Sequence, residues 1–449
     1  MTLREGRRER AVEALQALVR IPTVSHPEER DESTFGALLA ELAERFPLLH
    51  GLEVTRVHTH GLLVRWPGAR AEKPVVLMAH TDVVPVEDET RWTHPPFAGV
   101  VADGAVWGRG TLDDKGAAVA ICTAVEELLE DGHVPAQDVW ISLGCDEEVF
   151  GEAAPEAVRV LRERGVTPWF VLDEGGAVAG GAFPGVERPV AVVGVTEKGV
   201  TSVLLRAEGR GGHASTPAAN GPTARIARAV TALERSPMPA SVPAPTIELL
   251  RRLAPHARLP LGPVLAAATR VPAVLTRVLL AAGPETAAMT RTTFAVTTLT
   301  GSPAINVIAG AATAGVNIRV MLGDTVEDVL AHVRRAVGKD VAVEVLEEGA
   351  ASPLSPWTTD DGRPDEAFAL LEDTIREVFP DAVPAPYVMM AATDARHFTA
   401  ICDRVYRFAP FRMSKAQREA IHSHDEHLGV EDLLDGVRWF RRLVEGLPA

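Results

Sequence analysis

Apolar and polar positions in the first part of the chain follow the two periods that distinguish helices from strands. Apolar residues at helical spacing predict four helices, at 8–20, 34–45, 115–131 and 155–164. Charge-free, β-prone runs predict three strands between them, at 75–79, 139–143 and 169–172. Alternation of strands and helices is typical of an α/β fold. We therefore expect a mixed, mainly parallel sheet that is flanked by helices.

The order of predicted elements changes near residue 196. The later pattern predicts a strand, a helix, two strands, a helix and a strand, at 200–207, 221–235, 292–300, 311–321, 325–338 and 341–347. This β-α-β-β-α-β order is typical of a ferredoxin-like α+β sandwich. A Pro-, Ala- and Leu-rich insertion at about 237–291 interrupts it. We predict a discontinuous domain of residues 1–196 and 350–449, in which the last hundred residues complete the first sheet, and an inserted domain of residues 197–349.

Two apolar stretches are long enough to raise the question of a membrane span. The uncharged run 292–318 is broken repeatedly by Gly and Pro, which favours a pair of strands. The stretch 261–282 is interrupted by Arg270, Pro272 and Arg277, which favours short surface or interface helices over an anchor. No membrane partner is expected.

The composition limits which binding partners and which cellular compartment are expected. The chain is 46% hydrophobic and 24% charged, as folded globular proteins are, and its net charge of −16 would repel a phosphate backbone. Nucleic acid is therefore excluded as an expected partner. The three cysteines contain no CxxC pair, which argues against a disulfide framework or a thiolate zinc site. Six charges among the first ten residues do not fit a signal peptide, so we expect a cytoplasmic protein.

A histidine and an aspartate follow the first predicted strand. His80 and Asp82 are two residues apart, so they project to the same side at the C-terminal end of that strand, where α/β sites usually open. An imidazole that binds a metal normally donates its other N–H to a carboxylate, and Asp82 could accept it. The alternative is an ordinary turn.

A glycine-rich turn delivers two acids, Asp113 and Asp114, to the start of the predicted helix 115–131. One interpretation is an acidic helix N-cap, a position that Asp favours. Alternatively, Asp113 could bridge two cations, because its two oxygens can hold metals at the roughly 3.5–4 Å separation of two-metal hydrolysis.

Two further acidic pairs each follow a predicted strand. Glu147 and Glu148 come after the strand 139–143, and Asp173 and Glu174 come after the strand 169–172. One glutamate of the first pair could bind a metal while its neighbour takes a proton from water whose pKa the metal has lowered. His422 offers a second imidazole. Each residue could instead be a solvated surface group, but together they indicate a metal-dependent hydrolytic site.

Seven segments carry a resemblance to a known family. They are His80–Pro85, Gly108–Gly116, Asp146–Glu148, Leu172–Gly175, Gly212–Ser215, Asn306–Ile308 and His422–Glu426. These motifs and their order resemble the M20 metallopeptidase family. Within that family, the sequence is most similar to the branch of carboxypeptidase S and N-acyl-amino-acid hydrolases. The resemblance implies a zinc-peptidase-like catalytic domain, an inserted ferredoxin-like lid and dimerisation domain, and a homodimer.

The resemblance also implies roles for the acidic residues and the histidines. His80 would bind one metal, His422 and Glu148 would bind the other, and Asp113 would bridge them. Glu147 would be the general base, and Asp82 would orient His80. The remaining ligand is Glu174 or its rival Asp173, because branches of the family differ here. The family further implies a cis peptide between Asp113 and Asp114.

Substrate contacts are implied for four other residues. His213 would stabilise the tetrahedral oxyanion, often in the site of the partner subunit, and Asn306 and Arg319 would grip the substrate. A guanidinium can bind a carboxylate through two parallel hydrogen bonds, although Arg319 could also be a solvated strand residue. Thr393 could touch the substrate through its hydroxyl or its backbone. The family's usual Asn is replaced here by Asp425.

The expected reaction is hydrolysis of an amide or peptide bond next to a free carboxylate, with two Zn²⁺ ions or with Co²⁺ or Mn²⁺ in their place. The expected activity is that of a carboxypeptidase or dipeptidase on a small peptide. The first alternative is an aminoacylase that hydrolyses N-acyl amino acids, and the second is a non-catalytic peptide-binding protein.

Overall fold

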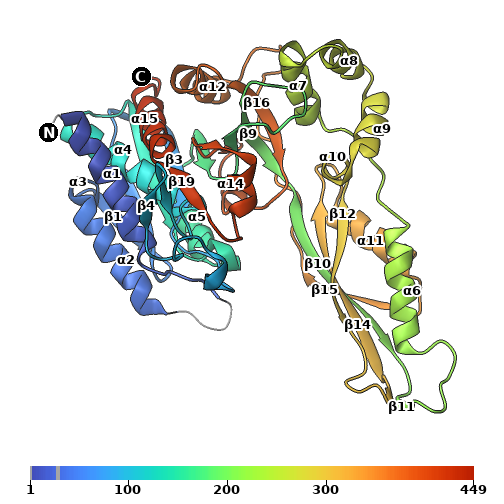
Figure 1. Cartoon of the computed structure of the whole chain (residues 1–449). Coiled ribbons are helices and arrows are strands. Elements are labelled where there is room, and N and C mark those ends of the chain that lie inside the picture. Colours follow the sequence, from blue (N-terminus) through green and yellow to red (C-terminus); the bar gives the residue numbers. More distant parts are fainter. Residues whose placement is uncertain (1–2, 27–30) are drawn as a thin grey trace.

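The computed structural model describes residues 3–26 and 31–449, and this part of the chain forms two large sheets at some distance from each other (Figure 1). The larger sheet has ten strands in the described residues. They are β1 (Glu53–Val57), β2 (Gly61–Trp66), β3 (Arg70–His80), β6 (Gln137–Gly144), β7 (Phe170–Asp173), β8 (Ala177–Ala179), β9 (Val190–Glu197), β16 (Val383–Met389), β17 (Val405–Arg407) and β18 (Arg412–Met413).

The centre of this sheet is parallel and one of its edges is antiparallel. Strand β3 lies between β6 and β7 and is parallel to both, whereas β1, β2 and β6 pair antiparallel. Strands β16, β17 and β18 come from residues after 350 and complete the sheet, as predicted. The carboxyl ends of β3, β6 and β7 meet at one edge. The predicted mixed α/β fold is confirmed.

Helices cover both faces of the larger sheet. They are α1 (Leu3–Val19), α2 (Glu32–Arg45), α3 (Pro47–His50), α4 (Lys115–Glu130), α5 (Ala153–Glu163), α12 (Glu366–Val378), α13 (Ala395–Phe398), α14 (Lys415–Ala420) and α15 (Val430–Glu445). Alternate residues of β3 separate the two cores. Val75 and Leu77 pack with α1, α4 and α15, while Val76 and Met78 pack with α5 and α13. The edge at which β3, β6 and β7 end thus belongs to a sheet that is buried on both faces.

A small three-stranded sheet joins the C-terminal part of the chain to the start of α4. It contains β4 (Val100–Ala102), β5 (Ala105–Trp107) and β19 (His427–Gly429), in the order β19-β5-β4. Residues 427–429 therefore lie directly beside residues 105–107. The short η1 (Glu89–Arg91) and η2 (Glu147–Val149) helices lie in loops at the same end of the larger sheet. These short strands were not predicted from the sequence.

The second large sheet has the predicted β-α-β-β-α-β order. Its strands are β10 (Gly199–Glu208), β12 (Thr293–Thr300), β14 (Ala311–Val320) and β15 (Ala342–Glu347), and its helices are α6 (Pro222–Glu234) and α11 (Val326–Val337). The strands are antiparallel in the order β12-β14-β10-β15. A separate apolar cluster lies between this sheet and its helices. A short pair, β11 (Gly212–His213) and β13 (Val307–Ile308), forms the tip farthest from the larger sheet (Figure 1).

The insertion is helical, and the uncharged run 292–318 falls on β12, β13 and β14, as the sequence indicated. The insertion contains α7 (Ala244–Leu253), η3 (Ala254–His256), α8 (Leu261–Ala268), α9 (Pro272–Ala282) and α10 (Pro284–Ala288). Helix α7 packs beside β16 of the larger sheet. None of the helices in the described ranges is both long enough and apolar enough to cross a bilayer.

Candidate functional site

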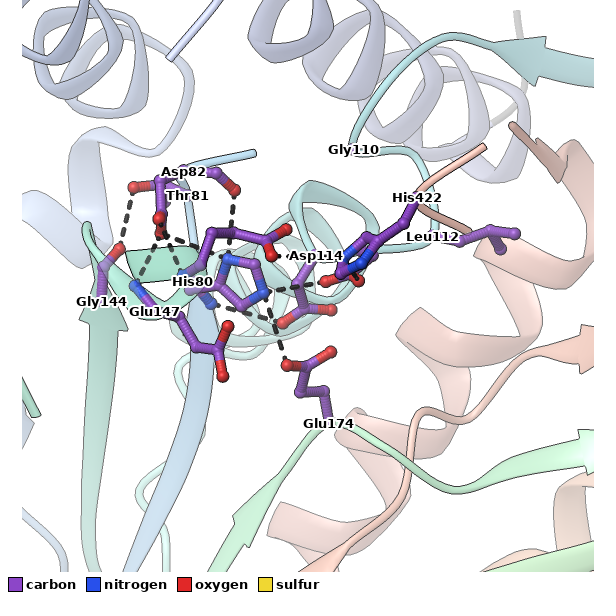
Figure 2. A network of polar contacts seen from close by, with 12 residues as sticks. His80, Thr81, Asp82, Gly110, Leu112, Asp114, Gly144, Glu147, Glu174 and His422 are labelled. Atoms are coloured by element: carbon purple, nitrogen blue, oxygen red, sulfur yellow. Dashed lines mark hydrogen bonds and ion pairs between the residues drawn. The ribbon is translucent and has the colours of Figure 1, made fainter. Parts of the chain in front are cut away.

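The acidic residues and histidines singled out in the sequence gather at the carboxyl edge of the larger sheet. His80 is the last residue of β3, Glu147 and Glu148 form η2 just after β6, and Glu174 follows β7. Because β3 lies between β6 and β7, these three strand ends bring their side chains to one point. Figure 2 shows His80 at the centre of this group, with Glu147, Glu174 and His422 around it.

His80 is buried and has a carboxylate on each side of its ring. Its Nδ1 lies 3.1 Å from the carbonyl oxygen of Asp82 and 3.3 Å from the Oδ1 of Asp82. Its Nε2 lies 2.9 Å from the Oδ1 of Asp113 and 3.4 Å from the Oε1 of Glu174. The Nδ1 contacts fix the ring, so that Nε2 points at the two other acids.

His422 approaches the same aspartate from the other side. Its Nε2 lies 2.9 Å from the Oδ2 of Asp113 and 3.2 Å from the Oε2 of Glu148. These two hydrogen bonds raise the pKa of His422 to about 10. The two oxygens of Asp113 therefore each face a different imidazole, and each imidazole has a further glutamate beside it.

The donor atoms of this cluster fit divalent cations. Two sets of three ligand atoms lie within 4.8 Å of one another, His80 with Asp113 and Glu148, and His80 with Asp114 and Glu174. Two buried oxygens, Oδ1 of Asp114 and Oε1 of Glu148, have no hydrogen-bond partner within the described chain. Burial and the charge of Asp113 raise the pKa of Glu174 to about 8. Carboxylates packed this closely repel one another, and cations would relieve that repulsion.

The sequence offered only one role for Asp114, that of an acidic helix N-cap. It stands at the N-cap position of α4, but its side chain caps nothing there. Its Oδ2 instead accepts a hydrogen bond of 3.3 Å from the backbone N–H of His80. The peptide bond between Asp113 and Asp114 is cis, as the family resemblance implied. Asp114 thus belongs to the acidic cluster and is not a helix cap.

Asp82 fixes both His80 and the turn that carries the two glutamates. Its two carboxylate oxygens accept hydrogen bonds of 3.2 Å from the backbone N–H groups of Glu147 and Glu148. Glu147 is almost fully buried, and burial raises its pKa well above the usual range, with the charges of Glu174 and Asp394 adding to the shift while His80 opposes it. The side chain of Glu147 is thus aimed into the cluster by a buried aspartate.

The structure places Glu174 toward His80 and Asp173 away from it. Oδ1 of Asp173 accepts a hydrogen bond from the N–H of Glu174 at 2.9 Å, and its Oδ2 accepts one from the N–H of Ala395 at 2.8 Å. Both oxygens of Asp173 are therefore engaged with the backbone, whereas Glu174 is free to face the imidazole.

Glu426 supports the loop that carries Asp113, a role that the sequence did not reveal. It is fully buried and accepts hydrogen bonds from the N–H groups of Gly110, Leu112 and Asp113 at 3.1, 2.8 and 3.2 Å. The guanidinium of the buried Arg109 lies 2.6 Å from its Oε2. More than 300 residues separate these partners, so only the presence of Glu426 in a family motif could have pointed to it.

We expect Glu426→Gln to lower the free energy of unfolding by about 3 kcal/mol, because one partner of a buried ion pair is removed and Arg109 stays buried. Urea unfolding measures this change. The matched control is Glu431→Gln, which breaks an exposed pair with Arg8 and should cost less than about 0.5 kcal/mol. Equal losses in the two variants would contradict the supporting role of Glu426.

Three of the residues expected to contact substrate lie within residues 197–349, on β14 or at the short pair of β11 and β13. His213 and Asn306 are exposed at the distal tip, where the carbonyl of Asn306 accepts a hydrogen bond of 3.1 Å from the N–H of Ala214 (Figure 1). Arg319 is half-buried on β14, and burial lowers its pKa. The structure brings His213 and Asn306 together, but it does not bring them to His80 within one chain.

Thr393 is buried at the edge of the larger sheet. Its N–H and its hydroxyl both donate to the Oε2 of Glu197, at 3.1 and 3.0 Å, and its carbonyl accepts from Arg396. Its polar groups are thus engaged within the chain, and its expected contact with substrate stays a prediction.

Comparisons with known proteins agree with this arrangement. The model of peptidase family M20/M25/M40 matches residues 76–446. The N-fatty-acyl-amino acid synthase/hydrolase PM20D1 of Xenopus tropicalis is 36% identical over 453 aligned positions, which cover 99% of this chain and 87% of that protein. The probable carboxypeptidase S-like 2 of Dictyostelium discoideum is 33% identical over 411 positions, covering 89% of this chain and 77% of that protein.

Solved structures share the fold. The M20 family metallo-carboxypeptidase Sso-CP2 from Sulfolobus solfataricus superposes with a TM-score of 0.70 at 16% identity, over 97% of this chain and 98% of that one. The family match covers most of this chain, and the relatives exceed 30% identity over nearly its whole length. The chain therefore belongs to peptidase family M20/M25/M40.

Proposed function

We propose that this chain hydrolyses an amide or peptide bond next to a free carboxylate, with two divalent cations that Asp113, His80 and His422 would help to hold. The observation that carries the proposal is the position of this aspartate, whose oxygens lie 2.9 Å from His80 on one side and 2.9 Å from His422 on the other. One carboxylate in that position can serve two cations at once.

The remaining donors divide between the two positions. Glu174 would join His80, and Glu148 would join His422, while Asp173 is the weaker candidate because both its oxygens are engaged. Imidazole nitrogens with carboxylate oxygens suit Zn²⁺, and Co²⁺ or Mn²⁺ could take its place. Bound there, the cations would polarise the substrate carbonyl and lower the pKa of a water molecule.

Glu147 is the group that moves the proton. We assign it as the general base that takes a proton from the attacking water and returns it to the leaving nitrogen. Asp82 keeps the carboxylate in place through the backbone of residues 147 and 148.

The second sheet would supply the rest of the site from a second copy of the chain. His213 and Asn306 lie at its tip, too far from their own cluster to touch a substrate there. In a homodimer, His213 of one copy would stabilise the oxyanion in the other, and Arg319 would bind the substrate carboxylate. Residues 197–349 would then act as a lid and dimerisation domain.

Mixing two inactive variants tests this arrangement. We expect His213→Ala and Glu147→Gln each to be inactive alone, because each removes one half of a shared site. Subunit exchange between them should restore up to about a quarter of wild-type activity, since half of the dimers would be mixed and each would hold one intact site. A mixture that stays inactive although co-purification of differently tagged copies shows mixed dimers would exclude a shared site.

Two substrate classes fit this centre. Relatives include a probable carboxypeptidase S-like protein and an N-fatty-acyl-amino acid synthase/hydrolase, which support a peptidase and an aminoacylase respectively. Cation-depleted protein reloaded with Zn²⁺, Co²⁺ or Mn²⁺ should be assayed on dipeptides and on N-acyl amino acids. Turnover of only one class decides between them, and inactivity with every cation and substrate would favour the non-catalytic binding protein.

A further inference from the structure

The insertion carries a surface that the proposed function does not use. Helices α8 and α9 are consecutive and lie at an outer corner of the molecule (Figure 1). Helix α9 buries Leu275 and Leu279 in a small cluster with α7 and α8. A helix whose apolar residues extend around from its buried face is normally covered there as well. Val274 and Val278 extend the apolar surface of α9 on one side of Leu275, and both are exposed, whereas Arg277 lies opposite the buried face.

Large hydrophobic side chains are concentrated on this surface. Fourteen are exposed in the described ranges, and five of them fall within residues 259–278: Leu259 (84%), Val264 (57%), Val271 (49%), Val274 (46%) and Val278 (51%). Val274 and Val278 are four residues apart and share one face of α9, and Val271 is the N-cap residue directly before the helix. Scattered exposed valines are ordinary, whereas a contiguous group marks a contact site.

The same surface has a positive charge, in contrast to the rest of the chain. Residues 259–284 contain no Asp or Glu, and their only charged residues are Arg270 and Arg277. Both arginines are exposed, and neither forms an ion pair with any described residue. The whole chain has a net charge of −16, so the charge of this segment is opposite in sign to that of the whole chain.

We propose that the α8–α9 surface docks on an anionic lipid surface, lying in its plane. The valines would enter the boundary between headgroups and acyl chains, and Arg270 and Arg277 would lie beside the lipid phosphates. With 8 and 11 residues, α8 and α9 are far too short to cross the bilayer, so the contact is peripheral.

Other occupants fit this surface less well. A two-fold contact between copies would pair this surface with itself, so Arg270 and Arg277 of one copy would lie near the same arginines of the other. Residues 259–284 contain no acid that could neutralise these charges. Protein interfaces usually centre on aromatic side chains, and this segment has none. A lipid surface requires neither a pocket nor an aromatic anchor, only apolar side chains with positive charge beside them.

Vesicle co-sedimentation of the full chain tests the proposal. We expect binding to phosphatidylcholine vesicles that contain phosphatidylglycerol, and weaker binding to phosphatidylcholine alone or at high salt. The double variant Val271→Glu, Val274→Glu should lower the partition coefficient on anionic vesicles about tenfold or more. The control is Val134→Glu, an even more exposed valine elsewhere on the chain, which should bind as the wild type does.

A second double variant and a measurement of thermal unfolding distinguish lipid binding from the other possible outcomes. The double variant Arg270→Gln, Arg277→Gln should lower binding to anionic vesicles about tenfold and leave binding to neutral vesicles unchanged. Thermal unfolding should be unaltered in both double variants, because all four side chains are exposed. Wild-type protein that does not sediment with anionic vesicles overturns the proposal, as does undiminished binding by the glutamate variant. Loss of a dimer in that variant, without vesicle binding by the wild type, would show an interface between copies instead.

Discussion

Glu147→Gln should abolish turnover while the protein keeps its cations. The substitution preserves the size of the side chain but removes the group that takes the proton, and such groups contribute about 10²–10⁴-fold to rate. We therefore expect kcat to fall about 1000-fold. Bound metal, measured by plasma mass spectrometry, should stay near the wild-type amount, because Glu147 makes none of the contacts between Asp113 and the two imidazoles.

Glu152→Gln is the matched control for this experiment. Glu152 is an exposed glutamate five residues further along the same segment, so its loss should leave kcat within about twofold of wild type. Wild-type turnover in Glu147→Gln would refute the assignment of the general base. A parallel loss of metal and activity would instead make Glu147 a ligand.

Asp113→Asn should remove cations from both positions together. An amide presents only one oxygen and no charge, so it cannot serve His80 on one side and His422 on the other. We expect the affinity for divalent cations to fall more than about 100-fold, which exceeds the usual effect of residues that only support a ligand. Metal titration followed by calorimetry measures the affinity, and turnover should fall with it.

Unfolding of the metal-free protein distinguishes a loss of cation binding from misfolding of the variant. With cations removed by a chelator, Asp113→Asn should still unfold cooperatively but somewhat more readily than the wild type, because His80 and His422 stabilise the charged carboxylate and hold the pKa of Asp113 well below its usual range. The control is Asp425→Asn, which installs the residue usual in the family at a position with φ of 63°, a conformation that Asn tolerates well. It should bind cations as the wild type does. Loss of a single cation in Asp113→Asn would show that the aspartate does not bridge.

The sequence predicted the parts of this molecule whose signals are local. Strand 75–79 is recognisable because a strand that is buried on both faces of a sheet is a continuous apolar run. His80 is recognisable because it is the first polar residue after that run. The β-α-β-β-α-β order followed from periodicity alone, and it appears in the second sheet strand by strand. The family and the mixed α/β fold were predicted from these patterns and their motifs.

Contacts between distant residues could not be predicted in this way. Strands β4, β5 and β19 have three residues each, too few for periodicity to show. Asp114 looked like a helix cap, because nothing in the sequence shows that its oxygen meets the backbone of His80 instead. Glu426 is separated from its partners by more than 300 residues, and its burial is visible only once β19 is seen to pair with β5.

The pairing of β19 with β5 also connects late residues of the chain to early residues of the cluster. His422 and Glu426 are the last described contributors to the cluster along the chain, and they lie just before residues 427–429, which pair with residues 105–107. A growing or truncated chain that stops before residue 422 has His80 and Glu147 but lacks the second imidazole and the clamp on the loop of Asp113. The cluster thus depends on a contact between two segments that are more than 300 residues apart along the chain.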